Sequence, residues 1–369
     1  MSAAPVVIAG GGTGGHVTPA LALGEAYRSL GISPCFIGSA RGIESRLVPQ
    51  AGFELIQLDA RPLVGRSAWQ RVTGLLALVR STASAWRVLR ARRTELVISV
   101  GGYASAPAGL AAALARIPLA LVNPDAVPGA ANRLLARFAG LICVGFPGAA
   151  EALAKRAAPE RVLVTGVPLR EALRKAFADV APLEADPAAP RNLFVFGGSQ
   201  GARQINDLML AALPSLDPDN LRIVHQTGAE DRERVDAAYA AAGFQAEVLE
   251  FEPDMPQRYR WAQLVVCRAG AISVAELALS GRASLLIPLA HVGGGEQFAN
   301  AAELAKRDAA QVLDSRQLGA EEFANALGAL LADPARLAAM GREAAGLARP
   351  GAAEEIVGAC ESLREGGRR

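Results

Sequence analysis

Short apolar runs alternate with longer segments of helical periodicity through the first half of the chain. The runs that predict strands are rich in Val, Ile and Leu and cover residues 6–9, 35–38, 54–58, 96–100, 119–122, 141–144 and 162–165. Apolar runs of this length are typical of strands in a parallel sheet that helices cover on both faces. The longest predicted helix between them runs from about residue 68 to residue 93.

The same alternation starts again after a stretch rich in Pro, Ala and Asp at 179–190, which predicts a linker. Further strands are predicted at 192–197, 221–225, 246–250, 264–267, 284–288 and 310–313, and residues 333–365 are helical. We therefore predict an α/β fold of two Rossmann-like domains, 1–165 and 190–345, each a parallel sheet wrapped by helices, with a C-terminal helix in 346–369 that packs back on the first domain. Because such sheets bind ligands beyond the carboxyl ends of their strands, the active site is expected in the cleft between the two domains.

Composition narrows the class of protein. Apolar residues make up 51% of the chain and aromatic residues only 5%, so the cores are expected to be aliphatic. The four cysteines lie far apart with no CxxC pair, which argues against a disulfide framework or a zinc site and favours the reducing cytoplasm. No apolar stretch reaches about 18 residues, and no signal-peptide pattern precedes the first strand.

Charge is distributed unevenly. Residues 1–164 hold 17 basic and 8 acidic residues (a difference of +9), and residues 165–369 hold 21 and 28 (−7). Residues 60–93 carry eight arginines and no acid, interleaved with Leu, Val and Trp, a pattern that suits docking on anionic lipid. The alternative is an ordinary packed helix with an arginine-rich exposed face. The charge of the first half indicates an anionic partner and by itself leaves a membrane surface, a phosphorylated substrate and nucleic acid open. Of these we expect phosphorylated substrates and anionic lipids, and not nucleic acid.

Three glycine-rich turns each follow a predicted strand and precede a helix, at 10–16, 101–107 and 197–201. Backbone N–H groups at the start of a helix attract phosphate, and glycine lets the backbone approach a ligand closely. The first turn also carries His16, one of only three histidines, just ahead of a helix predicted at 19–30. None of the turns is a Walker A motif or a GxGxxG with a following acid, which disfavours NAD.

The second half contributes hydrogen-bonding groups. Glu276 is expected about one turn into a helix that follows a buried strand, where its carboxylate suits a ribose diol. Gln297 and Asn300 follow a glycine loop and suit the hydroxyls of a sugar, and Arg170 suits a diphosphate. Asp217-Pro218-Asp219 is interpreted as a proline turn and not as a metal site, and no metal or cofactor is predicted.

Seven segments together resemble one family across nearly the whole chain: GGGTGGHVTPALAL, GGYASAPAGLAAA, AVPGAANRLLARFA, GVPLR, FGGSQGARQIN, VVCRAGAISVAEL and EQFANA. They are similar to the bacterial UDP-N-acetylglucosamine:lipid I N-acetylglucosaminyltransferases of glycosyltransferase family 28. The resemblance implies a GT-B fold whose C-terminal domain holds UDP-GlcNAc. It implies that the N-terminal domain binds undecaprenyl-diphosphoryl-muramoyl-pentapeptide at the cytoplasmic face of the inner membrane, where cell-wall synthesis proteins are further candidate partners.

The resemblance also implies roles for individual residues. His16 is the candidate general base or a stabiliser of the diphosphate, with Asp125 as the alternative base. The implied UDP-GlcNAc contacts are Thr13, Gly14, Gly15, Asp125, Arg170, Ser199, Gln200, Ala271, Ile272, Ser273, Val274, Ala275, Glu276, Gln297 and Asn300. The implied contacts of the acceptor diphosphate are Gly12, Gly102, Tyr103 and Ser105.

Some positions depart from the family pattern. Residues 122–125 read Val-Asn-Pro-Asp where the family usually has His-Glu-Gln-Asn, so Asp125 stands where a donor-contacting Asn is expected. Alanines at 269 and 275 replace the usual serines. Three alternatives to lipid II synthesis therefore stay open: a related transferase with another acceptor, a UDP-GlcNAc 2-epimerase, and a nucleotide-sugar-binding scaffold without activity.

Overall fold

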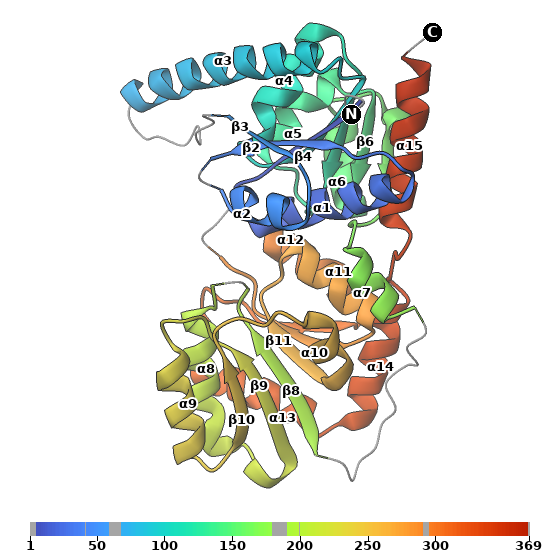
Figure 1. Ribbon diagram of the computed structural model, residues 1–369. Coiled ribbons are helices and arrows are strands. Elements are labelled where there is room, and N and C mark those ends of the chain that lie inside the picture. The colour runs from blue at the N-terminus through green and yellow to red at the C-terminus, as the bar shows by residue number, and fades with distance from the viewer. Residues whose placement is uncertain are drawn as a thin grey trace. The chain divides into compact units, whose positions relative to one another are not determined.

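The computed structural model describes residues 5–40, 42–58, 68–178, 190–198, 200–290 and 295–367, with residues 68–73 described by their backbone alone. The chain forms two compact units (Figure 1). Unit 1 consists of Met1–Glu171 together with Arg349–Arg369, and unit 2 of Ala172–Ala348. The predicted linker at 179–190 lies almost wholly outside the described residues.

Unit 1 is built on a parallel sheet of seven strands in the order β3-β2-β1-β4-β5-β6-β7. Its strands are β1 (Val6–Gly10), β2 (Cys35–Ser39), β3 (Leu55–Leu58), β4 (Leu96–Gly101), β5 (Leu119–Asn123), β6 (Leu141–Val144) and β7 (Val162–Val164). Its helices are α1 (Gly14–Ser29), α2 (Glu44–Gln50), α3 (Ala68–Ala91), α4 (Ser105–Ala115), α5 (Ala130–Leu135), α6 (Pro147–Ala154) and α15 (Ala352–Gly366), and α7 (Glu171–Ala176) begins at the boundary between the units.

The strand residues of unit 1 alternate between two apolar layers. Val6 and Ile8 pack with α1, α2 and α15 on one face, and Val7 and Ala9 pack with α3 and α4 on the other. Figure 1 shows α3 and α4 lying side by side. A sheet buried on both faces explains why its strands read as continuous apolar runs.

Unit 2 repeats the arrangement with six parallel strands in the order β10-β9-β8-β11-β12-β13. Its strands are β8 (Arg191–Phe196), β9 (Leu221–Gln226), β10 (Gln245–Leu249), β11 (Leu264–Cys267), β12 (Ala283–Leu286) and β13 (Ala310–Val312). Its helices are α8 (Arg203–Ala212), α9 (Arg232–Ala241), α10 (Met255–Trp261), α11 (Ala271–Ser280), α12 (Glu296–Ala305), α13 (Ala320–Leu331) and α14 (Pro334–Ala345).

All thirteen predicted strands are present among the described residues, with ends within two residues of the prediction. The predicted start of the first helix is wrong: α1 begins at Gly14 and not at residue 19. The glycines that the sequence assigns to the loop form the first turn of the helix, and Pro19 lies inside it. The four cysteines are free and buried. Within the described residues, no helix combines the length and apolarity needed to span a bilayer.

Two glycines test how tightly the helices of unit 1 pack. A Cβ at Gly109 on α4 would come within 2.5 Å of Leu135 Cδ1, whereas a Cβ at Gly358 on α15 would meet nothing within 4 Å. We expect Gly109→Ala to lower the free energy of unfolding by about 1–3 kcal/mol through overpacking. Gly358→Ala is expected to raise it by about 0.5–1 kcal/mol, because alanine stabilises a helix interior. Urea denaturation followed by circular dichroism checks both, and equal signs for the two changes would contradict the packing.

Candidate functional site

The candidate residues collect at the topological switch point of each sheet. In unit 1, β1 and β4 are neighbours, and the glycine turns at 10–16 and 101–107 follow them. In unit 2, β8 and β11 are neighbours, and the turn at 197–201 and the segment 268–276 follow them. Open α/β sheets bind ligands in the crevice outside the carboxyl ends at this point. Each unit therefore presents its chemistry at the same edge of its sheet.

The first glycine turn ends in a helix N-terminus that is open to a ligand. Thr13 precedes α1 and its carbonyl accepts the amides of His16 and Val17. Gly14 and Gly15 begin α1 and are exposed, and within the described residues their amides have no hydrogen-bond acceptor. Such first-turn N–H groups, at the positive end of the helix dipole, are an anion site.

His16 lies in the first turn of α1 and not in a loop ahead of it. Its Nδ1 is 3.0 Å from the hydroxyl oxygen of Thr13. The imidazole packs against the turn after β4, where a Cβ at Gly101 would lie 2.9 Å from His16 Cδ2. Gly101 and Gly102 also have φ angles of +99° and +78°, so both conformation and space require glycine there.

Burial lowers the pKa of His16 below its ordinary value of 6.5, although the charges of Asp125 and Glu44 oppose this shift. The imidazole is therefore neutral at pH 7. Its Nε2 has no partner among the described residues, so the ring can accept a proton there. These are the properties that a general base needs.

Asp125 belongs to the loop after β5, the strand next to β4. Asn123 shapes this loop: its side-chain amide donates to the Asp125 carbonyl at 2.6 Å and its Oδ1 accepts from Asn132 at 2.9 Å. The structure thus gives Asn123 a local role, because Asn123 and Asn132 form a buried amide pair that closes the turn. It also brings the charge of Asp125 close enough to raise the pKa of His16.

Four further sequence-predicted residues of unit 1 are already engaged within the protein. Gly12 donates its amide to the Glu44 carboxylate at 2.9 Å, and the Tyr103 hydroxyl lies 3.2 Å from Ser39 Oγ. Ser105 is buried and donates its hydroxyl to the Gly102 carbonyl. Gly102 itself contributes space for the backbone of the first turn. Their role toward an acceptor diphosphate stays a prediction.

Arg170 is ion-paired inside unit 1. Its Nε lies 2.6 Å from Glu25 Oε1, and the second oxygen of Glu25 accepts the amide of Glu171. The Arg170 side chain is 39% exposed, so an incoming diphosphate would have to compete with Glu25 for a partly solvated cation.

In unit 2 the glycine turn after β8 is locked to the loop after β9. A Cβ at Gly201 would overlap the Thr227 carbonyl, and a Cβ at Gly228 would overlap the carbonyl of Gln200. Gln200 is exposed at this turn, and the predicted Ser199 lies outside the described residues.

A buried network fixes the loop that the glycine turn contacts. Asn206 donates to the Thr227 carbonyl at 3.1 Å and to Asp231 at 2.8 Å. Its Oδ1 faces Nε2 of the fully buried His225, whose Nδ1 meets the Tyr239 hydroxyl. Burial lowers the pKa of His225 to about 3, so this histidine is a neutral structural link and not a further catalytic group.

Residues 271–276 form the first turns of α11, after the N-cap residue Gly270. Ala271 and Val274 face the core, while Ile272, Ser273, Ala275 and Glu276 are partly exposed. Glu276 lies in the second turn of the helix, slightly deeper than expected. Its Oε2 accepts the Tyr259 hydroxyl at 2.9 Å, which fixes the carboxyl group and leaves Oε1 for a ligand. Sequence reasoning missed Tyr259, because its helix α10 is distant in the chain.

Gln297 and Asn300, on α12, support the neighbouring loops. Gln297 Oε1 accepts the Leu289 amide at 2.8 Å. Asn300 is fully buried and donates to the Ala269 carbonyl at 3.1 Å, which ties α12 to the turn after β11. Asn300 thus has a structural contact where the resemblance implies a sugar hydroxyl.

Arg268 is a further residue at this edge to which the sequence analysis gave no role. Its guanidinium donates to the Ile287 carbonyl at 2.9 Å and to Gln204 Oε1 at 3.1 Å, and burial lowers its pKa. Neither of these two partners is a carboxylate. The sequence feature that could have identified Arg268 as a site residue is its position directly after a buried apolar strand.

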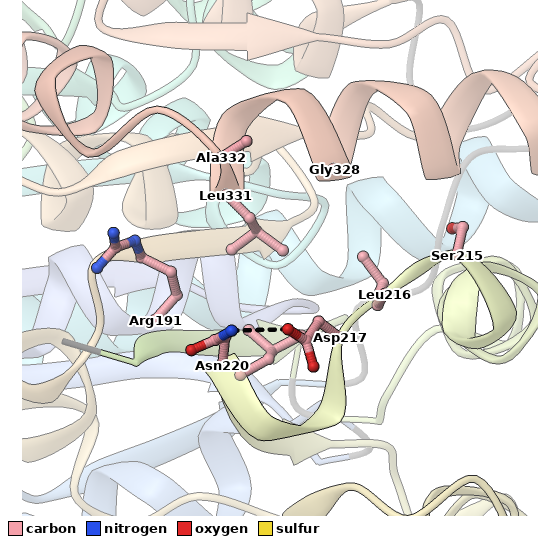
Figure 2. Close-up of a pocket in the computed structure, with 9 residues that line it drawn as sticks. Arg191, Ser215, Leu216, Asp217, Asn220, Gly328, Leu331 and Ala332 are labelled. Atoms are coloured by element: carbon pink, nitrogen blue, oxygen red, sulfur yellow. Dashed lines mark hydrogen bonds between the residues drawn. The ribbon is translucent and has the colours of Figure 1, made fainter. Parts of the chain in front are cut away.

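A cavity of about 420 Å³ in unit 2 lies away from these residues. Arg191 at the start of β8, Leu221 at the start of β9 and Leu331 at the end of α13 line it, so it opens at the amino edge of the sheet (Figure 2). Asp217 caps a short 3₁₀ turn there, accepting the Asp219 amide and the Asn220 side chain. Asp217 thus serves the turn, and the described residues contain no cluster of His, Cys, Asp and Glu able to hold a metal.

The titration of Glu276 is expected to make the stability of the protein depend on pH. Burial raises the pKa of its carboxyl group from 4.5 to about 7, against the opposing hydrogen bond from Tyr259. The folded state therefore holds a proton that the unfolded state releases between these pH values, so stability is lost as pH rises from about 4.5 to about 7. Glutamine does not titrate, so the variant Glu276→Gln escapes this loss. We expect the free energy of unfolding of the variant, minus that of wild type, to increase by up to about 3 kcal/mol between pH 4.5 and pH 8. Urea denaturation at the two pH values checks this, and a pH-independent difference would contradict it.

Comparison with known proteins identifies the family to which both units belong. Residues 6–144 match the glycosyltransferase family 28 N-terminal domain, and residues 192–356 match the C-terminal domain of the same family. A UDP-N-acetylglucosamine--N-acetylmuramyl-(pentapeptide) pyrophosphoryl-undecaprenol N-acetylglucosamine transferase of Syntrophotalea carbinolica is 42% identical over 363 residues, which cover 97% of this chain and 98% of the relative.

Solved structures show the same architecture. The crystal structure of MurG from Acinetobacter baumannii is similar with a TM-score of 0.79 and 30% identity, over 97% of this chain and 99% of that one. A structure named as a putative UDP-N-acetylglucosamine 2-epimerase of Listeria monocytogenes shares the fold at 16% identity, with a TM-score of 0.69 over 98% of this chain and 97% of that one. The predicted two-domain GT-B fold is confirmed, and the chain belongs to glycosyltransferase family 28 and is an N-acetylglucosamine-transferring glycosyltransferase.

Proposed function

We propose that the protein transfers GlcNAc from UDP-GlcNAc to the C4 hydroxyl of the muramoyl unit of undecaprenyl-diphosphoryl-muramoyl-pentapeptide (lipid I). The product is lipid II, the precursor for peptidoglycan, and through it the protein serves cell-wall growth, cell shape and division. The observation that carries this proposal is the position of His16, in the first turn of α1 and packed on Gly101 at the carboxyl edge of the unit 1 sheet, where the charge of Asp125 acts on it. The full-length similarity to transferases named for these substrates supports it.

The reaction is a single inverting displacement. The acceptor oxygen forms a bond to the anomeric carbon of GlcNAc as the bond from that carbon to the diphosphate oxygen breaks, and UDP leaves with the electron pair. The proton of the acceptor hydroxyl goes to His16 Nε2, or to the carboxylate of Asp125. A neutral base is needed for this step, and the lowered pKa of His16 supplies it at pH 7.

Negative charge grows on UDP during the displacement and requires stabilisation. The open amides of Gly14 and Gly15 at the start of α1 provide neutral donors, and Arg268 and Arg170 provide cations. Glu276 accepts hydrogen bonds from the ribose diol in its ionised form, with Tyr259 holding the second oxygen of the carboxylate. The donor site thus uses hydrogen bonds for the nucleoside and positive charge for the diphosphate.

Removal of the base gives the first test. We expect His16→Ala to lower kcat about 10²–10⁴-fold, because it removes a proton acceptor used only in the transition state. Asp125→Asn tests the alternative base, and the variant that loses the acidic limb of the pH–rate profile identifies the group. Asp217→Asn, which changes a distant turn, is the matched control and should retain full activity. The assay is transfer of radiolabelled GlcNAc from UDP-GlcNAc to a lipid I analogue.

The outcomes separate the alternatives. Tight binding of UDP-GlcNAc without transfer to the lipid I analogue would contradict the proposed acceptor and favour a related transferase or an inactive scaffold. Release of a 2-epimerised sugar without an acceptor would favour the epimerase reaction, to which the fold alone gives support.

The proposed location is the cytoplasmic face of the bacterial plasma membrane. An apolar groove of about 820 Å³ lies between α3 and α4, and the side chains of Leu75, Val79 and Leu114 in it are 58%, 59% and 71% exposed. Arg87 lines it, and Arg90 and Arg137 lie over the rings of the lining residues Trp86 and Phe138. Arg80 on α3 and Arg116 at the end of α4 are also exposed. An exposed apolar patch with a cationic rim supports docking on an anionic bilayer. Of the basic stretch predicted at 60–93, the side chains up to residue 73 lie outside the described residues.

Membrane docking is tested on vesicles. We expect the triple change Leu75→Ser, Val79→Ser and Leu114→Ser to abolish co-flotation with phosphatidylglycerol vesicles, because about 2 kcal/mol of transfer free energy is lost for each apolar side chain. Leu30→Ser is the matched control, since Leu30 is 59% exposed outside this groove. Equal flotation of the triple variant and wild type would contradict the proposal, as would equal binding to phosphatidylcholine vesicles.

A further inference from the structure

Glu44 is a fully buried carboxylate directly beneath the first glycine turn. It is the first residue of α2 and is 0% exposed. Oε2 accepts the Gly12 amide at 2.9 Å, and Oε1 accepts both the Ser39 amide at 2.8 Å and the Ser39 hydroxyl at 2.7 Å. Three donors from two other segments of the chain therefore converge on one side chain.

Three glycines make room for this carboxylate. A Cβ at Gly11 or Gly42 would overlap the carboxyl group, and a Cβ at Gly38 would lie 2.6 Å from Glu44 Cγ. None of the three has a φ in the left-handed region, so space and not backbone conformation requires glycine at these positions. The chain thus forms a cradle around Glu44 from the ends of β1 and β2 and the start of α2.

Glu44 has no cationic partner among the described residues, because all of its donors there are neutral. Burying a carboxylate costs free energy that a well-packed apolar side chain would avoid. A role in folding alone is therefore a weak reason for a carboxylate at this position. Its contacts lead instead to two predicted acceptor residues.

The first connection is a hydrogen-bond chain with a fixed direction. A carboxylate only accepts, so the single hydroxyl proton of Ser39 is directed at Glu44. The Tyr103 hydroxyl, 3.2 Å from Ser39 Oγ, must then donate to Ser39. The phenol oxygen of Tyr103 is left with lone pairs only, and it can accept a hydrogen bond from a ligand but cannot donate one.

The second connection is through the glycine turn that precedes His16. Gly12 has a φ of +94°, and a Cβ there would lie 2.8 Å from the ring of Tyr103. Glu44 holds the Gly12 amide in this conformation. The charged and titratable groups that act on His16 are Asp125 and Glu44, and the Thr13 hydroxyl is bonded to its Nδ1.

We propose that Glu44 is a positioning residue for the acceptor substrate: it fixes the turn that carries His16 and orients the Tyr103 hydroxyl as a hydrogen-bond acceptor. The group that Tyr103 binds is then a hydroxyl or an amide N–H of the muramoyl-peptide and not an oxygen of the diphosphate. The inference rests on the proposed function, since it concerns the same acceptor site.

The test compares Glu44→Gln, Ser39→Ala and Tyr103→Phe in steady-state transfer from UDP-GlcNAc to a lipid I analogue. A glutamine has one acceptor oxygen, so it cannot satisfy both the Gly12 and the Ser39 donors. We expect kcat/KM for the acceptor to fall about tenfold or more in each variant, while KM for UDP-GlcNAc stays within about twofold of wild type. Glu54→Gln, an exposed glutamate paired with Arg92, is the matched control with unchanged kinetics.

Two further readouts separate positioning from general damage. Tyr103→Phe should cost much less in the Glu44→Gln background than in wild type, because the two residues act through one hydrogen-bond chain. The acidic limb of the pH–rate profile should move to lower pH in Glu44→Gln, since the Glu44 charge raises the pKa of His16. Circular dichroism verifies that each variant is folded, and Ser39→Ala keeps the proposal testable if Glu44→Gln is not.

Unchanged acceptor kinetics in Glu44→Gln and Ser39→Ala would overturn the proposal, as would independent, multiplicative effects of Glu44→Gln and Tyr103→Phe. Wild-type protein that fails to use the lipid I analogue would instead count against the proposed function. In that case the same variant ratios are measured with whichever acceptor the wild type glycosylates, so the two failures are distinguishable.

Discussion

The close approach of backbone and side chains at the carboxyl ends of β1 and β4 is the constraint on which the unit 1 site depends. His16 packs against Gly101 and Gly102, and Tyr103 packs against Gly12. Any Cβ at these glycines would push the imidazole or the phenol away from the sheet edge. Their positive φ angles add a second reason, because other residues rarely adopt that conformation. The glycine-rich turns therefore do two things: they expose amides to a ligand, and they let two aromatic side chains lie where the strands end.

Desolvation sets the pKa values of the two titratable candidate residues, His16 and Glu276. Burial lowers the pKa of His16 and so keeps the imidazole neutral, and burial raises the pKa of Glu276 to about 7, so that this carboxyl group changes charge in the physiological range. His225 shows that burial alone is not a functional signature. It is buried even more deeply, but both of its ring nitrogens are bonded to Tyr239 and Asn206, and nothing is left for a ligand. What distinguishes His16 is the combination of a lowered pKa with an unoccupied Nε2 at the sheet edge.

The sequence predicts the strands well because a strand buried on both faces must be apolar throughout, and this signal is local. It predicts the candidate site only in part. His16, Glu276 and the glycine turns carry local signals in their spacing, whereas Glu44 and Tyr259 act on the site from segments far away in the chain. A buried glutamate at the start of a short helix reads in sequence like an ordinary first-turn acid favoured by the helix dipole. Only the three-dimensional contact with Gly12 and Ser39 shows otherwise.

The start of α1 illustrates the same limit in reverse. Glycine and an internal proline both disfavour helix, and local propensity therefore places the helix start after Pro19. The structure begins the helix five residues earlier, because the carbonyl of Thr13 accepts the amides of His16 and Val17 and the packing of Val17 and Ala20 against the sheet supports the first turn. The cost in propensity has a functional reason. A helix that began at residue 19 would leave His16 on a loop, whereas a helix that begins at Gly14 fixes His16 on a rigid element and presents the amides of Gly14 and Gly15 beside it.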